Sequence, residues 1–140
     1  MSFDTVIASI KTQLRNNWST TPIRFQNEQA DPPIASDGSP LPWVYFEVDG
    51  GTDEQMSIGS PGSNTYRRRG TIAAHVFVPT KSGDDIALGY AVQVGAIFRG
   101  QSFGAVTCEG ASIAGGAKGD DDGLWWLRSV TVPFWTDEGA

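Results

Sequence analysis

Residues 66–98 decide the fold, because they contain a strand pattern and a helix pattern joined by a short polar loop. They read YRRRGTIAAHVFVP (66–79), TKSGDD (80–85) and IALGYAVQVGAIF (86–98). From residue 71 to residue 78 the side chains alternate, which places four apolar residues on one face: Ile72, Ala74, Val76 and Val78. A period of two is typical of a strand with one face on the core. Pro79 cannot donate a ladder hydrogen bond, so we expect the strand to end there.

The helix expected next runs from Asp84 to about Arg99. Asp84 and Asp85 are suited to its start, as N-cap and as negative charge at the positive end of the helix, and Gly100 is suited to the C′ position. Most of the circumference is apolar, apart from a polar or small stripe: Asp85, Gly89, Gln93 and Ala96. The sheet can cover only one side of such a helix, so we expect a neighbouring subunit to cover the rest.

The remaining elements surround this centre. A helix is expected over residues 3–18, where apolar residues recur at helical spacing: Phe3, Val6, Ile7, Ile10, Leu14 and Trp18. Strands are expected at residues 23–25, 43–48, 105–113 and 124–135, with the last two paired as a hairpin. Residues 26–42 and 49–65 are expected to be mobile loops, and the acidic tail 136–140 is expected to fray.

This order of elements predicts a single α+β domain over residues 1–140. We expect an antiparallel or mixed sheet with two main helices packed on one face. Gly89 and Gly95 each weaken the second helix by roughly 1 kcal/mol relative to alanine, which is consistent either with close packing at these positions or with a tolerated weakness.

The composition limits the classes of function. The chain has 140 residues, a formal net charge of −6 and a pI near 4.5. Such an acidic domain is a poor candidate for nucleic-acid binding, which needs basic surface. Cys108 is the one cysteine, so an internal disulfide and a zinc–cysteine cluster are excluded and a reducing compartment fits. No apolar run approaches 18 residues and the first residues lack a signal-peptide pattern, so we expect neither a membrane span nor secretion.

Catalytic and metal-binding chemistry is weakly represented. His75 is the one histidine, it lies in mid-strand, and we expect a structural or interface role for it. Asp120, Asp121 and Asp122 could bind a hard cation, but they lack EF-hand spacing and are typical of a solvated turn. Cys108 is expected to be a small buried hydrophobe. The sequence therefore predicts no enzyme, no catalytic residue, no cofactor and no metal site.

Three consecutive arginines, Arg67, Arg68 and Arg69, stand out in this acidic chain. They could grip phosphate, or they could pair with carboxylates in this chain or on a neighbour, which suits the planar guanidinium fork. We favour ion pairing, because phosphate sites usually spread over a wider basic face. Alternation places Arg67 and Arg69 on the face opposite the apolar set, and Arg68 on the apolar face.

Three segments together resemble one protein family: YRRRGTIAAHVFVPTKSG (66–83), ALGYAVQVGAIFRG (87–100) and the closing VTVPFW (130–135). The family is the tail terminator, or tail completion, proteins of phages and prophages with long non-contractile tails. The order of elements is similar over nearly the whole chain. The most specific part of the resemblance runs from Arg69 to Gly100.

The resemblance implies a non-enzymatic structural protein of the virion. Members of this family are α+β domains that form a hexameric ring, cap the head-proximal end of the growing tail tube, stop its polymerisation and present a surface to the head connector. The implied partners are further copies of the chain, the tail tube protein and the head–tail connector protein, without membrane or sequence-specific nucleic-acid binding. The implied location is the virion tail, and the host cytoplasm during assembly.

A closed ring needs a head-to-tail interface between unlike surfaces of one chain. The candidate residues for an oligomer or tube interface are Arg67, Arg68, Arg69, Gly89, Gln93, Met56 and Ile58. Two other classes stay open beside the terminator. One is another head–tail adaptor or ring component of the tail, and the other is a small ligand-binding module with a pocket lined by Trp43, Trp125 and Trp126.

Overall fold

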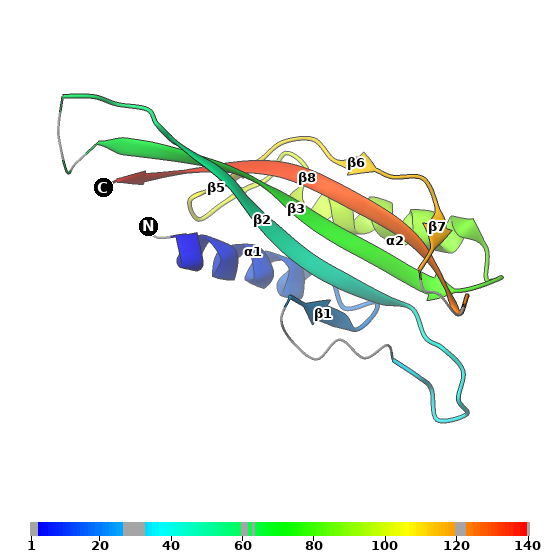
Figure 1. Cartoon of the computed structure of the whole chain (residues 1–140). Helices are drawn as coiled ribbons and strands as arrows, with labels where there is room; N and C mark the ends of the chain where they lie inside the picture. The colour runs from blue at the N-terminus through cyan, green and yellow to red at the C-terminus, as the bar shows by residue number, and fades with distance from the viewer. Residues whose placement is uncertain (1–2, 27–32, 60–61, 63, 120–122, 140) are drawn as a thin grey trace.

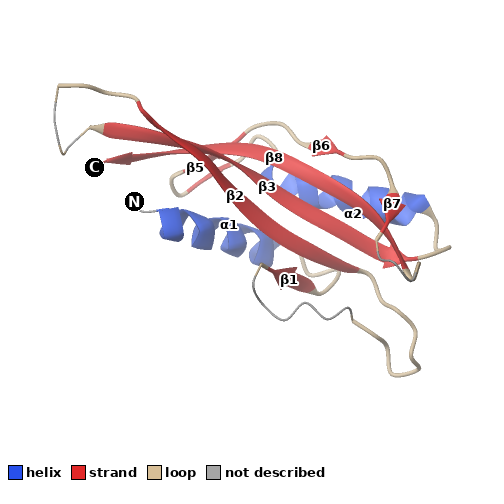
Figure 2. Ribbon diagram, viewed as in Figure 1, coloured by secondary structure: helices blue, strands red, loops and turns tan. Residues whose placement is uncertain are grey.

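The structure is a computed structural model that describes residues 3–26, 33–59, 62, 64–119 and 123–139. These residues form two helices and eight strands, and the strands make one mixed, open sheet (Figure 1). The elements in chain order are α1 (Phe3–Asn17), β1 (Ile23–Phe25), β2 (Trp43–Gln55), β3 (Thr65–Pro79), α2 (Asp84–Phe98), β4 (Ser102–Phe103), β5 (Val106–Cys108), β6 (Ser112–Ile113), β7 (Ala117–Lys118) and β8 (Trp125–Gly139). The expected α+β class is confirmed (Figure 2).

The strand β3 is the centre of the sheet. The strand order is β1-β2-β3-β8-β5-β4, with β6 and β7 also paired to β8. The pairing of β1 with β2 is parallel, and the other pairings are antiparallel. The ladder between β3 and β8 runs without a shift from the pair Thr65↔Gly139 to the pair Pro79↔Trp125. The strand that the sequence singles out therefore has a hydrogen-bonded neighbour on each side.

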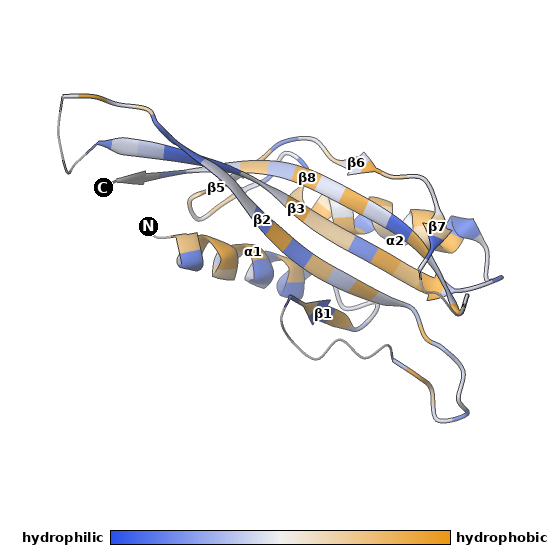
Figure 3. Ribbon diagram, viewed as in Figure 1, coloured by the Kyte–Doolittle hydropathy of each residue, from blue (hydrophilic) through white to orange (hydrophobic). Residues whose placement is uncertain are grey.

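The even-numbered side chains of the long strands form the core. On β3 the four residues Ile72, Ala74, Val76 and Val78 are each at most 1% exposed, as their alternation predicts. The same core cluster contains residues of both helices: Val6, Ile10 and Leu14 of α1, and Ala87, Ala91, Val94 and Phe98 of α2. Phe98 stacks on Phe46 of β2 with 5.7 Å between ring centroids. Figure 3 shows the matching alternation of hydropathy along β2 and β3.

Several elements have the expected bounds. Helix α1 ends at Asn17, β1 spans Ile23–Phe25 and α2 spans Asp84–Phe98, each within one residue of the prediction. Gly100 has φ +65°, the left-handed value that favours glycine after a helix. These are the segments in which local pattern and final structure agree.

The expectation of a loop over residues 49–65 is wrong for its first part, because β2 continues to Gln55. The register with β3 shifts at residues 50–51, where Gly51 has φ +59° and a Cβ would lie 1.8 Å from the carbonyl oxygen of Arg69. A glycine bulge of this kind lets the strand bend and then resume its pairing. Past the bulge two acid–base pairs lie opposite each other in the ladder: Asp53 with Arg68, and Glu54 with Arg67. Such cross-strand pairs favour a strand over a loop.

The expected strand over residues 105–113 is interrupted. Both β5 and β6 pair with β8, at Cys108↔Phe134 and Ser112↔Thr131, so four steps on one side oppose three steps on the other. The extra residue leaves the ladder as a bulge. The opposing part of β8 contains Pro133, which has no N–H to donate, although its carbonyl still accepts from the N–H of Glu109 at 2.9 Å.

The expectation of a fraying acidic tail is also wrong as far as Gly139, because β8 extends to that residue. Thr136 has no exposed surface, and Asp137 forms an ion pair with Arg67 of β3. The first residues of β3 supply a paired neighbour that the tail sequence alone does not reveal. The expected turn at residues 120–122 and residues 27–32 of the other expected loop lie outside the described part of the chain.

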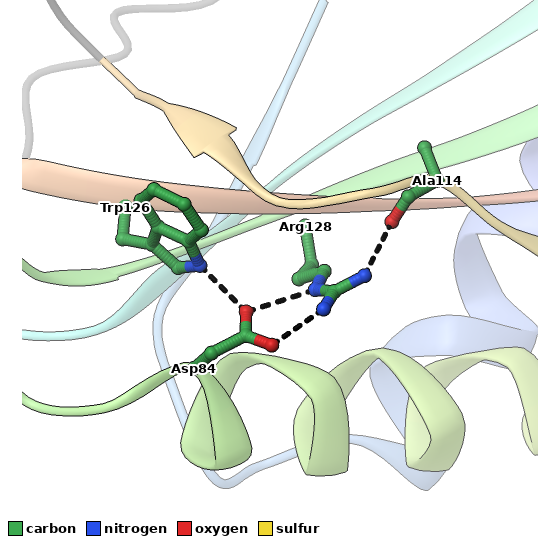
Figure 4. Close-up of polar contacts among 4 residues, drawn as sticks. All are labelled: Asp84, Ala114, Trp126 and Arg128. Carbon is green, nitrogen blue, oxygen red and sulfur yellow. Dashed lines mark hydrogen bonds and ion pairs between the residues drawn. The ribbon is translucent and has the colours of Figure 1, made fainter.

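Helix α2 is fixed to the sheet through its first residue. Asp84 Oδ1 accepts hydrogen bonds from Trp126 Nε1 at 2.6 Å and from Arg128 Nε at 2.9 Å, and Oδ2 is paired with the other arm of the guanidinium (Figure 4). Arg128 also donates to the carbonyl oxygen of Ala114 at 3.0 Å. The expected capping role of Asp84 is wrong, because the N-cap is Gly83 and no side chain caps the helix there. Its carboxylate instead joins α2 to β8, and Arg128 extends this link to the segment between β6 and β7.

We expect Asp84→Asn to lower the free energy of unfolding at pH 7. The hydrogen bonds from Arg128 and Trp126 lower the pKa of Asp84 from 3.8 to about 2. The ionised carboxylate therefore stabilises the fold fully above about pH 4, and this contribution is lost as the pH falls toward 2. Urea unfolding at stepped pH should show the gap between the native chain and Asp84→Asn closing below about pH 4.

The matched control is Asp85→Asn, which changes the next residue of the same helical turn. Asp85 is exposed and should contribute only about 0.3–1 kcal/mol through the helix dipole. A gap for Asp84→Asn that stays constant down to pH 2, or that is no larger than the control, would contradict the anchoring role.

Candidate functional site

Three strands continue past the core as a projecting arm. We define the arm as residues 52–55 of β2, 65–69 of β3 and 135–139 of β8, with the turn residues 56–59 and 64 at its tip. Figure 1 shows this end of the sheet extending past the start of α1 and away from α2. Five of the seven interface candidates lie on the arm: Met56, Ile58 and the three arginines.

Arg67 fastens two strands of the arm to each other. Its Nε donates to Asp137 Oδ1 at 2.8 Å, and its Nη2 donates to Oδ2 at 3.1 Å. The guanidinium also lies 4.0 Å from the ring centroid of Trp135. The hydrogen bonds of this pair lower the pKa of Asp137 and raise the pKa of Arg67. A bidentate pair is geometrically specific, so Arg67 is engaged within the chain and holds the arm in shape.

The other two arginines differ from each other. Arg68 lies on the core side, 4.6 Å from the ring centroid of Phe3 and 4.0 Å from Asp53 Oδ2, as the alternation predicts. Its Nε is buried with no hydrogen-bond partner in the described part of the chain. Arg69 is exposed. Contacts within the chain thus engage the Arg67 guanidinium fully and the Arg68 guanidinium in part. A role at an interface stays a prediction for all three arginines.

The arm tip presents two large apolar side chains to solvent. Met56 is 46% exposed and Ile58 is 88% exposed. Hydrogen bonds nevertheless hold the turn: the N–H of Met56 donates to the Thr65 carbonyl at 2.8 Å, and the N–H of Thr65 donates to Ser57 Oγ at 2.8 Å. Two exposed large apolar side chains, two residues apart on a projecting tip, favour contact with another molecule.

The outward face of α2 combines exposed apolar side chains with the polar or small stripe. Ile86 is 41% exposed and Val92 is 53% exposed. Gly89 and Gln93 lie on the same face, as predicted, and Gln93 is exposed. The close packing expected at Gly89 is absent, since a Cβ placed there would have no neighbouring atom within 4 Å. This part of the helix is left uncovered by the described residues.

A groove of about 350 Å³ lies beside this face, between α2 and residues 110–113. Its lining is Ala91, Val92, Gly95, Ala96, Arg99, Gly110, Ala111 and Ile113. Gly95 does show the expected close packing, since a Cβ there would lie 3.1 Å from Val130 Cγ2 and 3.4 Å from Ala111 Cβ. Ile113 is 37% exposed at the groove wall. We call this hollow the α2 groove. Its lining is apolar except for Arg99.

His75 lies in a hydrogen-bonded network on the opposite face of the sheet. Its Nε2 is 2.9 Å from Glu47 Oε1 on β2, and its Nδ1 is 2.7 Å from Ser129 Oγ on β8. With the proton on Nε2, the ring donates to Glu47 and accepts the hydroxyl hydrogen of Ser129. Sequence reasoning missed both partners because neither is near His75 along the chain. The strand register alone brings them together.

This network has the order of carboxylate, imidazole and hydroxyl found in serine hydrolases. A hydrolase also needs donors for the developing oxyanion and space for a substrate. Ser129 lies inside the β8 ladder, where its carbonyl accepts from the N–H of Ala114 at 2.8 Å. The hollow of about 520 Å³ on this face is lined by Glu47 but by neither His75 nor Ser129. We therefore interpret the network as a structural tie across three strands.

The three tryptophans named for a ligand pocket do not converge. Trp43 stacks on Phe77 with 4.4 Å between ring centroids. Trp125 pairs with Pro79 and Phe77 pairs with Leu127, which places Trp43 and Trp125 on the odd-numbered face. Trp126 lies on the even-numbered face and donates to Asp84. The proposed pocket with all three rings in its wall is therefore wrong.

Those remaining candidate residues that the structure describes offer no further site. Cys108 is buried, as expected, and burial raises its pKa to about 11, which keeps the thiol protonated near neutral pH. The residues Asp120, Asp121 and Asp122 lie outside the described part of the chain. Among described residues, no group of three or more His, Cys, Asp or Glu side chains is placed to hold a metal ion. No described helix combines the length and apolarity that crossing a bilayer requires.

Comparison with known proteins gives information on the fold. No protein-family model and no curated protein matches the chain significantly. One solved structure aligns with 97% of this chain and 96% of its own chain, at a TM-score of 0.66 and 18% sequence identity. At that identity the likeness shows a shared fold alone.

We expect the His75 network to be structural, so a fluorophosphonate probe should leave Ser129 unlabelled. Ser129→Ala should lower the free energy of unfolding by about 1 kcal/mol, the usual value of one hydrogen bond. Both are measurable, by intact mass after probe treatment and by urea unfolding. Labelling that the native chain shows and Ser129→Ala loses would contradict the structural interpretation.

Proposed function

We propose that this chain is a structural virion protein that caps a phage tail tube as a ring, ends tail polymerisation and forms the junction to the head connector. The family resemblance of residues 66–100 and 130–135 suggests the role. The observation that carries it is the arm tip, where Ile58 is 88% exposed directly after Ser57, whose hydroxyl accepts a hydrogen bond from the N–H of Thr65. A site of this kind recognises another macromolecule by burying apolar surface.

The construction of the arm supports an assembly role. The Arg67–Asp137 pair joins β3 to β8, the Arg68–Asp53 pair joins β3 to β2, and Arg68 also contacts Phe3 at the start of α1. A binding element that is ordered before docking loses less conformational entropy when it binds. The arm therefore has the property expected of a contact used repeatedly in a symmetric assembly.

The outward face of α2 supports the same role from another part of the molecule. Ile86 and Val92 are exposed on a helix whose polar stripe is narrow. Two unlike apolar surfaces on one chain are what a head-to-tail interface requires, and such an interface closes into a ring when the rotation between copies allows it. A tail ring built this way would leave the exposed Arg69 for contacts with the tube or the connector.

The proposal is tested by the length of tails in phage particles that lack this chain. Electron microscopy should show overlong tails without heads, because nothing stops the addition of tube protein. Purified chain added to growing tails should restore a uniform length. Addition of the variant Ile34→Asp, which changes an exposed apolar residue on another loop, should restore it equally well.

Tails of normal length in the absence of the chain would contradict the terminator role. If those normal tails fail to join heads, the chain is a head–tail adaptor. If they join heads, it is not a component of this junction.

A further inference from the structure

The chain carries a projecting apolar tip and an apolar groove of matching chemistry. Met56 and Ile58 at the arm tip follow the last ladder pair of β2 and β3, Gln55 with Tyr66, and are 46% and 88% exposed. The α2 groove has a volume of about 350 Å³ and walls of Ala, Val, Gly and Ile side chains. An isoleucine side chain that leaves water for such a groove is stabilised by the burial of its apolar surface. Each feature lacks a cover within the described residues.

The tip cannot fill the groove of its own chain. Figure 1 shows the arm leaving the body on the side away from α2, and the groove lies between the second half of α2 and the segment before β6. The arm is also held straight by paired strands on both sides of β3, up to Thr65. An occupant of the groove must therefore come from another molecule.

Charge favours the same match. Arg99 is exposed at the rim of the groove, and no partner for its side chain occurs among the described residues. Glu54 is exposed on the arm two residues before Met56. Glu54 lies opposite Arg67 in the ladder, but the Arg67 guanidinium bonds to Asp137. An arm seated in the groove would therefore bring the Glu54 carboxylate toward Arg99, which suits the planar fork of arginine. The apolar and the charged elements thus point to one occupant, the arm of a second copy.

We propose that the arm tip of one copy seats Met56 and Ile58 in the α2 groove of the next copy. This inference rests on the proposed ring and specifies its interface. Because tip and groove are different surfaces of the same chain, the contact is head-to-tail and each copy uses both halves once. An incomplete ring then has one unoccupied tip at one end and one unoccupied groove at the other end, until the ring closes.

The test is disulfide cross-linking between Ile58→Cys and Ala96→Cys, each made with Cys108→Ser. Ala96 is exposed in the groove lining, and Cys108 is buried. The two variants are mixed, added to tails that lack the chain, and oxidised. We expect a mixed dimer on denaturing gels. The matched control replaces Ala96→Cys by Ser36→Cys, an exposed position on a distant loop, and should give no such dimer.

Electron microscopy of the same samples separates the two proposals. Capped tails with the mixed dimer support the inference. Capped tails without the mixed dimer overturn it and leave the terminator role standing. Tails that stay uncapped with the folded Cys108→Ser chain overturn the terminator role, and the inferred interface with it.

A second variant tests the tip without cysteine chemistry. Ile58→Asp changes a side chain that is 88% exposed, so the fold should persist by circular dichroism. We expect at least a tenfold loss of capping activity on tails. Ile34→Asp, at a side chain that is 52% exposed, is the control and should retain activity. Full activity of Ile58→Asp would overturn the inference.

Discussion

The ladder on both sides of β3 is the constraint on which the rest of the structure depends. This 15-residue strand pairs with β8 along its whole length and with β2 from the core into the arm. Its even-numbered residues from Ile72 to Val78 belong to the same core cluster as buried residues of α1 and α2. Its first residues, 65–69, lie beyond that core and form the central strand of the arm. A single strand therefore fixes both the hydrophobic core and the projecting surface, and Gly51 permits the transition between them by accepting a bulge.

The elements that the sequence predicts well are those with a local pattern. The spacing of apolar residues locates α1, and the left-handed Gly100 marks the end of α2. The arm was not predictable in this way, because residues 49–55 and 136–139 have the composition of loops. Their strand structure depends on pairs such as Arg67 with Asp137, which lie 70 residues apart in sequence. The same limit applied to the site: exposed Met56 and Ile58 could be nominated from the sequence, whereas the Glu47–His75–Ser129 network required the register.

The proposed assembly role rests on these surfaces together. Ion pairs and cation–π contacts hold the arm in shape. The exposed apolar side chains at the tip are not needed for these contacts, so they are available to contact another molecule. The groove beside α2 offers room because Gly95, Ala96 and Ala111 are small. The net charge of −6 is compatible with a lumen through which DNA passes without adhering. The proposed ring joins these features, since one contact repeated around an axis would use both surfaces of every copy.

The most direct measurement of the central claim is a cryo-electron microscopy reconstruction of isolated phage tails that contain this chain. The account predicts a closed ring of copies at the head-proximal end of the tube, with density for each arm reaching the neighbouring copy. Density for this chain along the length of the tube, as isolated single copies, or nowhere on the tail would contradict it.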